Sequence, residues 1–125
     1  MSDDQRYNDG MAVRRAVLGD PYVDRALASV DELSADMQRY VTEAAWGSVW
    51  TRPGLPRRER SLITIAMLVA LNRPHELRVH VTGGLRNGLT QKEIVELIMH
   101  SAAYCGFPAS LDALRVAREV FAETP

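Results

Sequence analysis

The sequence is poor in the features that stabilise secreted and membrane proteins. Its 125 residues contain one cysteine, Cys105, which argues against an internal disulfide and against a zinc site built from several thiolates. The longest apolar stretch, residues 62–71, is too short for a membrane span of about 20 residues. The N-terminal residues MSDDQRYNDG are acidic and polar, where a signal peptide would be basic and then apolar. These absences predict a small cytoplasmic protein.

The chain also has no excess of charge of either sign. Fifteen Lys and Arg residues against sixteen Asp and Glu residues give a net charge of −1, which argues against nucleic acid or an anionic membrane as a partner. Lysine is nearly absent, because every basic residue except Lys92 is arginine. The planar guanidinium group of arginine binds carboxylates and phosphates through two hydrogen bonds, so the excess of arginine over lysine indicates either an anionic ligand or a coding bias.

Length and periodicity predict one all-α domain over residues 1–125, a bundle of about six helices. Apolar residues recur every three or four positions, and no segment alternates convincingly with period two. Glycine, proline and a Thr90–Glu93 capping box mark the ends of the helices. The expected helices are 3–18, 21–47, 56–71, 74–87, 91–105 and 109–122. Residues 62–71 are apolar on all sides, which predicts that neighbouring elements bury them.

No phosphate-binding, serine-hydrolase, zinc-protease or calcium-binding motif occurs, so the candidate chemistry depends on single residues. His80 lies on the expected buried stripe beside Leu77 and Val81, and Gly84 leaves space for a small ligand or for a closely packed helix. It is either a core histidine with satisfied hydrogen bonds or an acid–base group. A metal bound by His80 and Glu76 would have only two ligands, so no metal is expected.

The other candidate residues can be interpreted as structural or as functional. Glu43, three residues before Trp46, is either an acid–base group or an exposed residue at the edge of the apolar stripe. Trp46 and Trp50, followed by Arg52, suit a planar anionic ligand or an exposed interface. Cys105 lies on an apolar stripe at a helix C-terminus, where the helix dipole disfavours thiolate, so we expect a packed, inert thiol.

Four segments that span nearly the whole chain resemble the carboxymuconolactone decarboxylase family. They are RYNDGMAVRRAVLGDPYVDRA (6–26), AAWGSVWTRPGLPRRERSLITIAMLVALNR (44–73), HVTGGLRNGLTQKEI (80–94) and AAYCGFPA (102–109). The wider superfamily, which includes alkylhydroperoxidase-like proteins, shares the helical fold and has a C-x-x-C pair before its histidine. Here Arg73 and Glu76 occupy those two positions, which argues against dithiol chemistry. SLDALRVA (110–117) and Gly83–Gly84 depart from the family pattern, which predicts a shifted substrate preference if they line the pocket.

The resemblance implies a cofactor-independent carboxy-lyase of aromatic catabolism. The family converts 4-carboxymuconolactone to 3-oxoadipate enol-lactone in the protocatechuate branch of the 3-oxoadipate pathway. We expect His80 to deliver a proton, since its ordinary pKa of about 6.5 suits that task near neutrality. Glu43 would orient His80 or relay its proton. The residues expected to bind carboxylate are Arg14, Arg52 and Arg60, and those expected to wall the site are Trp46 and Tyr104.

The resemblance further implies a homo-oligomer, a hexamer or a trimer, in which sites between subunits would be natural. Alternatives to the main interpretation stay open. One is a family member acting on another lactone or acid, and a second is a thiol-linked reductase or peroxidase that uses Cys105. A third is a binding or assembly module that has kept the scaffold without the chemistry.

Overall fold

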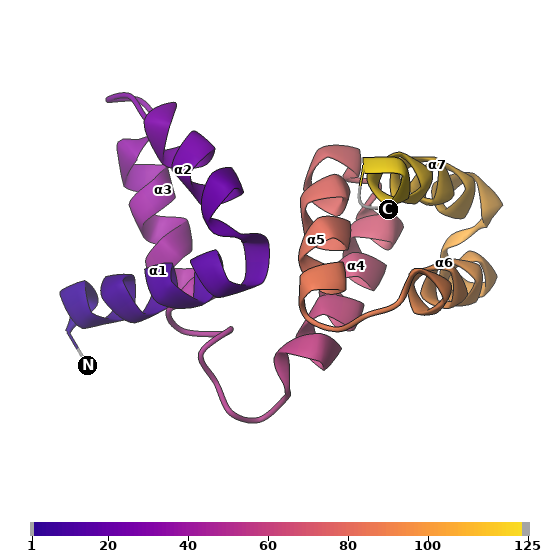
Figure 1. Cartoon of the computed structure of the whole chain (residues 1–125), viewed down its shortest axis with the longest axis horizontal. Helices are drawn as coiled ribbons and strands as arrows, with labels where there is room; N and C mark the ends of the chain where they lie inside the picture. Colours follow the sequence, from indigo (N-terminus) through magenta and orange to yellow (C-terminus); the bar gives the residue numbers. More distant parts are fainter. Residues whose placement is uncertain (1, 124–125) are drawn as a thin grey trace. The chain divides into compact units, whose positions relative to one another are not determined.

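The computed structural model describes residues 2–123, and every regular element in that part of the chain is a helix (Figure 1). In chain order these are α1 (Asp3–Leu18), α2 (Asp20–Ala28), α3 (Ala35–Val41), the π-helix η1 (Thr42–Trp46), α4 (Arg57–Leu71), α5 (Pro74–Arg86), α6 (Gln91–Cys105) and α7 (Phe107–Glu123). The expected all-α class is confirmed. Within residues 2–123, no helix combines the length and the apolar character that crossing a membrane requires.

The helices form two compact units that meet in sequence between Pro56 and Arg57. The N-terminal unit contains α1, α2, α3 and η1, and the C-terminal unit contains α4 to α7. Each unit has its own set of packed helices: α1 lies on η1 in the first, and α4 lies on α5 and α6 in the second. That both units belong to one domain over residues 1–125 stays a prediction.

The single helix expected between Pro21 and Gly47 is wrong, because the chain turns after α2 and resumes as α3 and η1. The turn is built by Asp31, whose Oδ1 accepts the backbone N–H groups of Leu33 at 2.9 Å and Ser34 at 3.0 Å. Short polar side chains of this kind offer the backbone an alternative to helical bonding. Side chains expected on the buried face are consequently exposed: Leu33 by 91%, Met37 by 66% and Tyr40 by 65%.

Two glycines allow α1 and η1 to pack backbone against backbone. A Cβ atom at Gly10 would lie 2.3 Å from the carbonyl oxygen of Thr42, and one at Gly47 would lie 2.4 Å from that of Arg6. Both distances are far below van der Waals contact, so no side chain fits at either position. The N–H of Gly47 donates to the Thr42 carbonyl at 2.8 Å, five residues back, which is the widened turn of a π-helix.

The C-terminal unit encloses a continuous apolar core between its four helices. Its buried members are Ile65, Val69, Leu77, Val81, Leu89, Ile94, Ile98, Ala113, Ala117 and Val120. A Cβ at Gly84 would lie 3.0 Å from the side chains of both Ile65 and Leu89. Gly84 was expected to leave space either for a small ligand or for a closely packed helix. The structure shows close packing against α4, with no empty space for a ligand.

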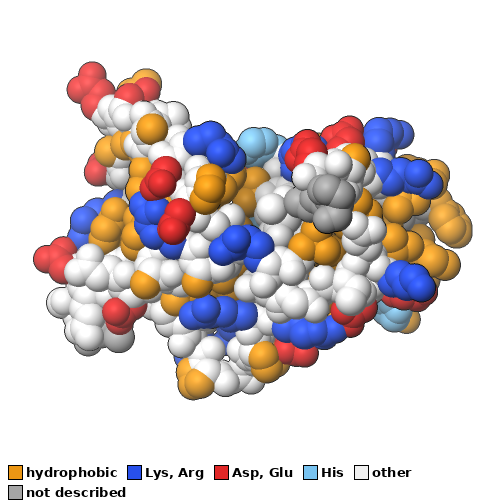
Figure 2. Space-filling model, in the orientation of Figure 1, with side chains coloured by type: hydrophobic (Ala, Val, Ile, Leu, Met, Phe, Trp, Pro, Cys, Tyr) orange, Lys and Arg blue, Asp and Glu red, His pale blue; other side chains and the backbone are white. Residues whose placement is uncertain are grey.

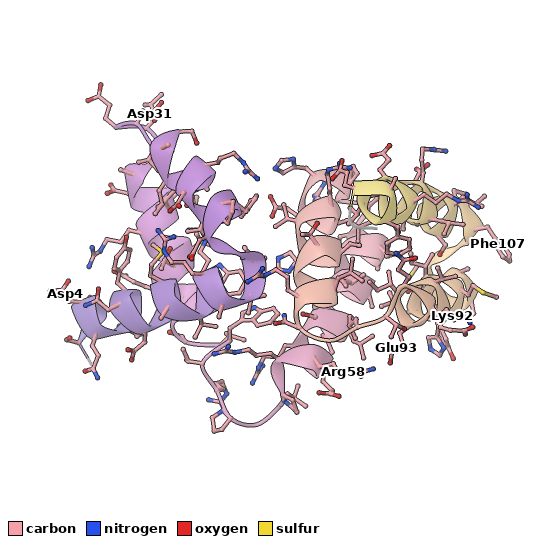
Figure 3. The ribbon with its side chains drawn as sticks, in the orientation of Figure 1. Asp4, Asp31, Arg58, Lys92, Glu93 and Phe107 are labelled. Carbon is pink, nitrogen blue, oxygen red and sulfur yellow. The ribbon has the colours of Figure 1, made fainter. Side chains whose placement is uncertain are left out.

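Polar contacts tie the ends of these helices together. The amide of Asn87, after α5, donates to the buried Ser61 hydroxyl of α4 at 2.8 Å. Arg58 of α4 forms an ion pair with Glu93, which also completes the capping box of α6 with Thr90 (Figure 3). The expected capping box is thereby confirmed, and it fixes where α6 begins.

Two expectations for the C-terminal unit need correction. The segment of residues 62–71 is not buried on all sides, because Ile63, Met67 and Leu71 are exposed by 42%, 59% and 63%. The last helix begins at Phe107, two residues before its expected start, since the ring of Pro108 is compatible with a first helical turn. Gly106, at φ 94°, separates it from α6 as the sequence predicted.

Candidate functional site

His80 lies on α5 between the buried residues Leu77 and Val81, and its own side chain is half-buried. Burial lowers the pKa of His80 from 6.5 to about 4, because a charged imidazolium loses hydration there. The ordinary pKa of about 6.5, on which the sequence argument for proton delivery relied, is therefore not the pKa of His80 in the folded chain. In the free protein at pH 7 the imidazole is therefore neutral.

The lowered pKa of His80 predicts a loss of stability in acid. Between about pH 6.5 and pH 4 the unfolded chain binds a proton at His80 that the folded chain does not bind, so protonation favours unfolding. We expect this group to contribute at most about 3 kcal/mol to the fall in the free energy of unfolding across that window. Urea unfolding at pH 7 and pH 4.5 measures it, and His80→Gln should show a smaller fall than the parent. Equal falls would contradict the prediction.

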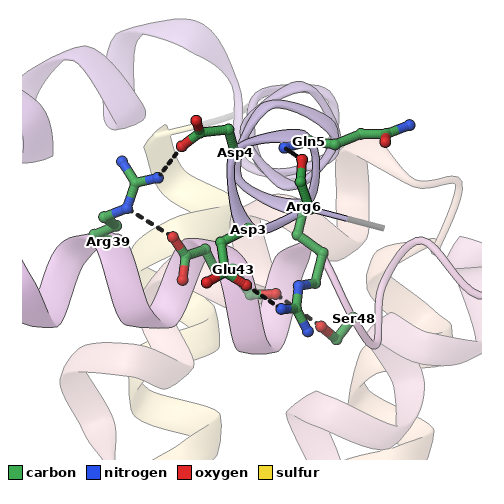
Figure 4. Close-up of polar contacts among 8 residues, drawn as sticks. Asp3, Asp4, Gln5, Arg6, Arg39, Glu43 and Ser48 are labelled. Atoms are coloured by element: carbon green, nitrogen blue, oxygen red, sulfur yellow. Dashed lines mark hydrogen bonds and ion pairs between the residues drawn. The ribbon is translucent and has the colours of Figure 1, made fainter.

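Glu43 occupies the first turn of η1, with a side chain that is 19% exposed. Its Oε1 lies 2.7 Å from Nε of Arg39, and the same guanidinium lies 2.7 Å from Oδ1 of Asp4 (Figure 4). The guanidinium also stands over the ring of Tyr7, 4.7 Å from its centre. Arg39 thus joins α1 to η1 and orients the Glu43 carboxylate. Sequence reasoning missed Arg39, although its spacing of four residues from Glu43 is the signal of a helical ion pair.

Arg14 is buried in α1, where only 5% of the residue is exposed. Its Nη1 donates to Oε1 of Gln38 at 3.0 Å and to Oγ1 of Thr42 at 3.3 Å. The Thr42 hydroxyl in turn donates to the Gln38 carbonyl at 2.8 Å. Arg14 therefore braces the junction of α3 and η1 directly beside Glu43. Its predicted contact with a substrate carboxylate stays a prediction.

The two tryptophans pack against each other and are buried, which corrects the expected exposed pair. Their ring centres are 4.9 Å apart, and Trp46 and Trp50 are exposed by only 5% and 8%. Trp46 ends η1, one helical turn after Glu43. Arg52 follows in the connector and is exposed. An apolar wall and a carboxylate thus lie on the same short π-helix.

The remaining predicted residues lie on different helices of the C-terminal unit. Arg60 is half-buried in the first turn of α4, and Tyr104 is 81% exposed near the end of α6, with its ring 5.3 Å from that of His100. Cys105 is exposed, so the expected packed thiol is wrong. The reason is local: α6 ends at this residue, and every residue from 103 to 108 is exposed.

The structure thus divides the seven predicted site residues between the units. Arg14, Glu43 and Trp46 cluster on or against η1, and Arg52 follows it; His80, Arg60 and Tyr104 lie on α5, α4 and α6. Within residues 2–123, no three His, Cys, Asp or Glu side chains are grouped as a metal ion would require. The geometry defines an all-α protein with a desolvated histidine in one unit and a fixed carboxylate beside an aromatic wall in the other.

Comparison with known proteins shows which family of helical proteins this chain belongs to. The family model described as "Carboxymuconolactone decarboxylase family" matches residues 35–119, and the chain belongs to that family. It is 49% identical to a 4-carboxymuconolactone decarboxylase of Acinetobacter baylyi, an alignment that covers 97% of this chain and 90% of the relative. It is 40% identical to the nitrosuccinic acid decarboxylase npaB of Metarhizium robertsii, over 90% of this chain and 79% of that protein.

Proposed function

We propose that the protein is a cofactor-independent carboxy-lyase that converts 4-carboxymuconolactone to 3-oxoadipate enol-lactone and CO2 in protocatechuate catabolism. The observation that carries the proposal is the 49% identity to the Acinetobacter baylyi relative of that name along nearly the whole of both chains. Membership of the family and the ionisable groups at His80 and Glu43 support it.

The substrate supplies its own electron sink. The carboxylate that leaves stands on a ring carbon joined through an alkene to the lactone carbonyl, so the electrons of the breaking C–C bond pass into that carbonyl and form a dienolate. Addition of one proton to the carbon next to the carbonyl then gives the enol-lactone. The protein must therefore hold a dianion, stabilise charge on the lactone oxygen and supply one proton.

His80 is the residue we assign to that proton. Its neutral imidazole in the free protein leaves room for one proton, and two substrate carboxylates beside it would raise its pKa and stabilise the imidazolium. The imidazolium then gives the proton to the dienolate carbon, returns to the neutral form and takes its next proton from solvent. In this scheme His80 takes up its proton only when the substrate anion binds, so the free enzyme does not hold a charged imidazolium in a desolvated position.

The other assigned roles follow from charge and shape. Glu43, oriented by Arg39, would orient His80 or relay its proton. The aromatic faces of Trp46 and Tyr104 would wall the substrate. The cations proposed for its two carboxylates are Arg14, Arg52 and Arg60.

We expect Glu43→Gln to lower kcat about 10-fold or more, because the amide can neither accept nor pass on a proton. Glu32→Gln, at an exposed residue, is the control. An unchanged kcat in Glu43→Gln would remove Glu43 from the mechanism.

The deciding experiment measures CO2 release from 4-carboxymuconolactone, formed in place from protocatechuate by the preceding enzymes, with and without EDTA. We expect rapid release that EDTA does not slow. No release from a folded sample would overturn the proposal, and EDTA-sensitive release would overturn its cofactor-independent form.

A second candidate is a decarboxylase of a different acid, favoured by the 40% identity to the nitrosuccinic acid decarboxylase. In nitrosuccinic acid the carbon next to one carboxyl group bears a nitro group, so loss of CO2 again leaves electrons in an adjacent sink. The same protein groups would serve both reactions. Nitrosuccinate is therefore the second substrate to assay, and a higher kcat/KM for it than for the lactone would select this candidate.

The exposed Cys105 permits a direct test of thiol chemistry. We expect Cys105→Ser to keep CO2 release within about 2-fold of the parent, because the proposed reaction transfers no electrons to sulfur. Ser29→Ala, a change of similar size at an exposed residue of the N-terminal unit, is the control. A loss of activity confined to Cys105→Ser would favour the thiol-linked reductase or peroxidase.

We further propose a cytoplasmic homo-oligomer, a hexamer or a trimer. An unpaired, exposed thiol suits a reducing compartment. Among residues 2–123, twelve large hydrophobic side chains are at least 40% exposed in the single chain, and burial between subunits would remove them from water.

A further inference from the structure

A charged groove of about 490 Å³ lies between the start of α6 and the later part of α7, and we call it the α6–α7 groove. Half-buried apolar side chains form its floor, and exposed charged side chains line its rim. The floor contains Val95, Leu114 and Phe121, and the rim contains Lys92, Glu96 and Arg118. Figure 2 shows hydrophobic side chains between basic ones over these two helices, and Figure 3 places Lys92 on α6. Sites for small molecules have volumes of about 300–1,000 Å³, so the groove is large enough for one.

The two basic side chains of the groove have no acidic partner in the described part of the chain. Among residues 2–123, neither Lys92 nor Arg118 forms a side-chain hydrogen bond or an ion pair. Arg78 and Arg115 of the same unit, by contrast, both pair with acidic side chains. With Glu96 as the acidic residue of the lining, two positive charges and one negative charge leave the groove with a net charge of +1. An excess of unpaired positive charge beside apolar surface favours an anion that has an apolar part.

We infer that the α6–α7 groove binds a small monocarboxylic acid whose body is an aromatic ring system. Lys92 and Arg118 both have long, flexible side chains, so one carboxylate can contact the two of them. The ring system would then cover Val95, Leu114 and Phe121, and the ring of Phe121 gives it an aromatic face to stack on. One negative charge on the ligand balances the net charge of +1, whereas a dicarboxylate would place a second anion near the groove's own carboxylate. The groove's ligand is independent of the proposed decarboxylation, since none of these residues is assigned to that reaction.

A second hollow on α6 has the opposite charge balance. It has a volume of about 630 Å³, and Lys92 lines it together with Glu93, Glu96 and His100. His100 aside, one positive charge and two negative charges leave this hollow with a net charge of −1, which repels a carboxylate. Glu93 is already engaged in the capping box of α6 and in an ion pair with α4. Of the two hollows, the α6–α7 groove is therefore the one whose charge suits an acid.

The test is an NMR titration of the ¹⁵N-labelled full chain with 2-naphthoate, an aromatic monocarboxylate. We expect a dissociation constant on the order of 1 mM, the usual strength for a ligand of about 13 non-hydrogen atoms, with the largest amide shifts in α6 and α7. 2-Naphthamide has the same shape without the charge and should bind at least about 5-fold more weakly. A salt concentration of about 0.5 M should reduce this difference to less than about 2-fold, because salt screens exposed charges.

Four substitutions in the groove and one outside it separate charge from shape. We expect Lys92→Gln and Arg118→Gln each to raise the dissociation constant of 2-naphthoate about 3- to 5-fold, since each removes one exposed ion pair. Phe121→Leu should raise it about 3-fold by removing the aromatic face. Glu96→Gln should lower it about 2- to 3-fold, because a like charge is lost from the rim. Arg86→Gln, at an exposed residue at the end of α5, is the control and should leave it unchanged.

Equal binding of 2-naphthoate and 2-naphthamide, or a dissociation constant that neither Lys92→Gln nor Arg118→Gln changes, would overturn the inference. A larger loss of binding in Arg60→Gln would also overturn it, because the probe would then occupy the proposed substrate site. Circular dichroism checks that each variant keeps its helices. We expect Lys92→Gln and Arg118→Gln to release CO2 within about 2-fold of the parent. Failure of the groove therefore leaves the decarboxylase proposal to be decided by CO2 release alone.

Discussion

Replacement of His80 by glutamine is expected to slow CO2 release by about 10²- to 10⁴-fold, the usual contribution of a positioned acid–base group. Glutamine keeps most of the side-chain volume and a hydrogen-bonding end, but it cannot carry a proton to the dienolate. Because the loss falls on proton delivery, kcat should drop more than KM rises. Steady-state CO2 release across pH 5 to 9 measures both parameters.

The matched control is His75→Gln, since the side chain of His75 lies in the first turn of the same helix and is 83% exposed. We expect this variant to keep the parent's rate. The free energy of unfolding at pH 7 should be similar in the parent and both variants, which separates a lost reaction from a lost fold. An H80Q enzyme that folds and turns over within about 3-fold of the parent would remove His80 from the mechanism.

Alanine at Gly10 is expected to destabilise the N-terminal unit by about 3 kcal/mol or more. Its Cβ would lie 2.3 Å from the Thr42 carbonyl oxygen and 2.7 Å from the backbone nitrogen of Gly47. Both are backbone atoms, one in η1 and one in the residue that follows it, so no side-chain rotation relieves the clash, and α1 must move away from the π-helix. Displacement of η1 would also move Glu43 and lower the rate of decarboxylation.

Tryptophan fluorescence in urea reports this change, because both tryptophans, Trp46 and Trp50, belong to the N-terminal unit. Gly54→Ala is the control: a Cβ there meets no atom within 4 Å, so its stability should match the parent or exceed it slightly. Equal midpoints for the Gly10 and Gly54 variants would show that α1 and η1 do not pack as closely as the structure indicates.

Helix ends were predictable from sequence wherever a local signal marks them. Gly19, Gly88 and Gly106 all adopt positive φ, and the Thr90 capping box starts α6, because these signals act over a single turn. Periodicity failed between α2 and α3. The apolar spacing continued through Leu33, but α2 ends at Ala28, and the Asp31 carboxylate holds the residues that follow in a turn.

Sequence reasoning named candidate residues for the site, whereas their arrangement came only from the folded chain. His80 was found from its position on the stripe of α5, whereas the lowered pKa follows from the desolvation of its imidazole in the folded chain. The spacing of Arg39 and Glu43 was visible in sequence, but their link to Asp4 required α1 to lie against η1. No periodicity argument finds Gly10 and Gly47, since both matter only through a helix distant in sequence.

By itself, the sequence determined the helical class, most helix ends, the absence of a cysteine pair and the likeness to the decarboxylase family, since each depends on residue type and short spacing. Tertiary structure alone decided which apolar faces are covered, where Arg14 is buried, why Gly84 is small and that Cys105 is exposed. The physical reason is that burial is a property of neighbouring elements. A stripe is buried only where another helix packs on it, and that contact joins residues that no local pattern relates.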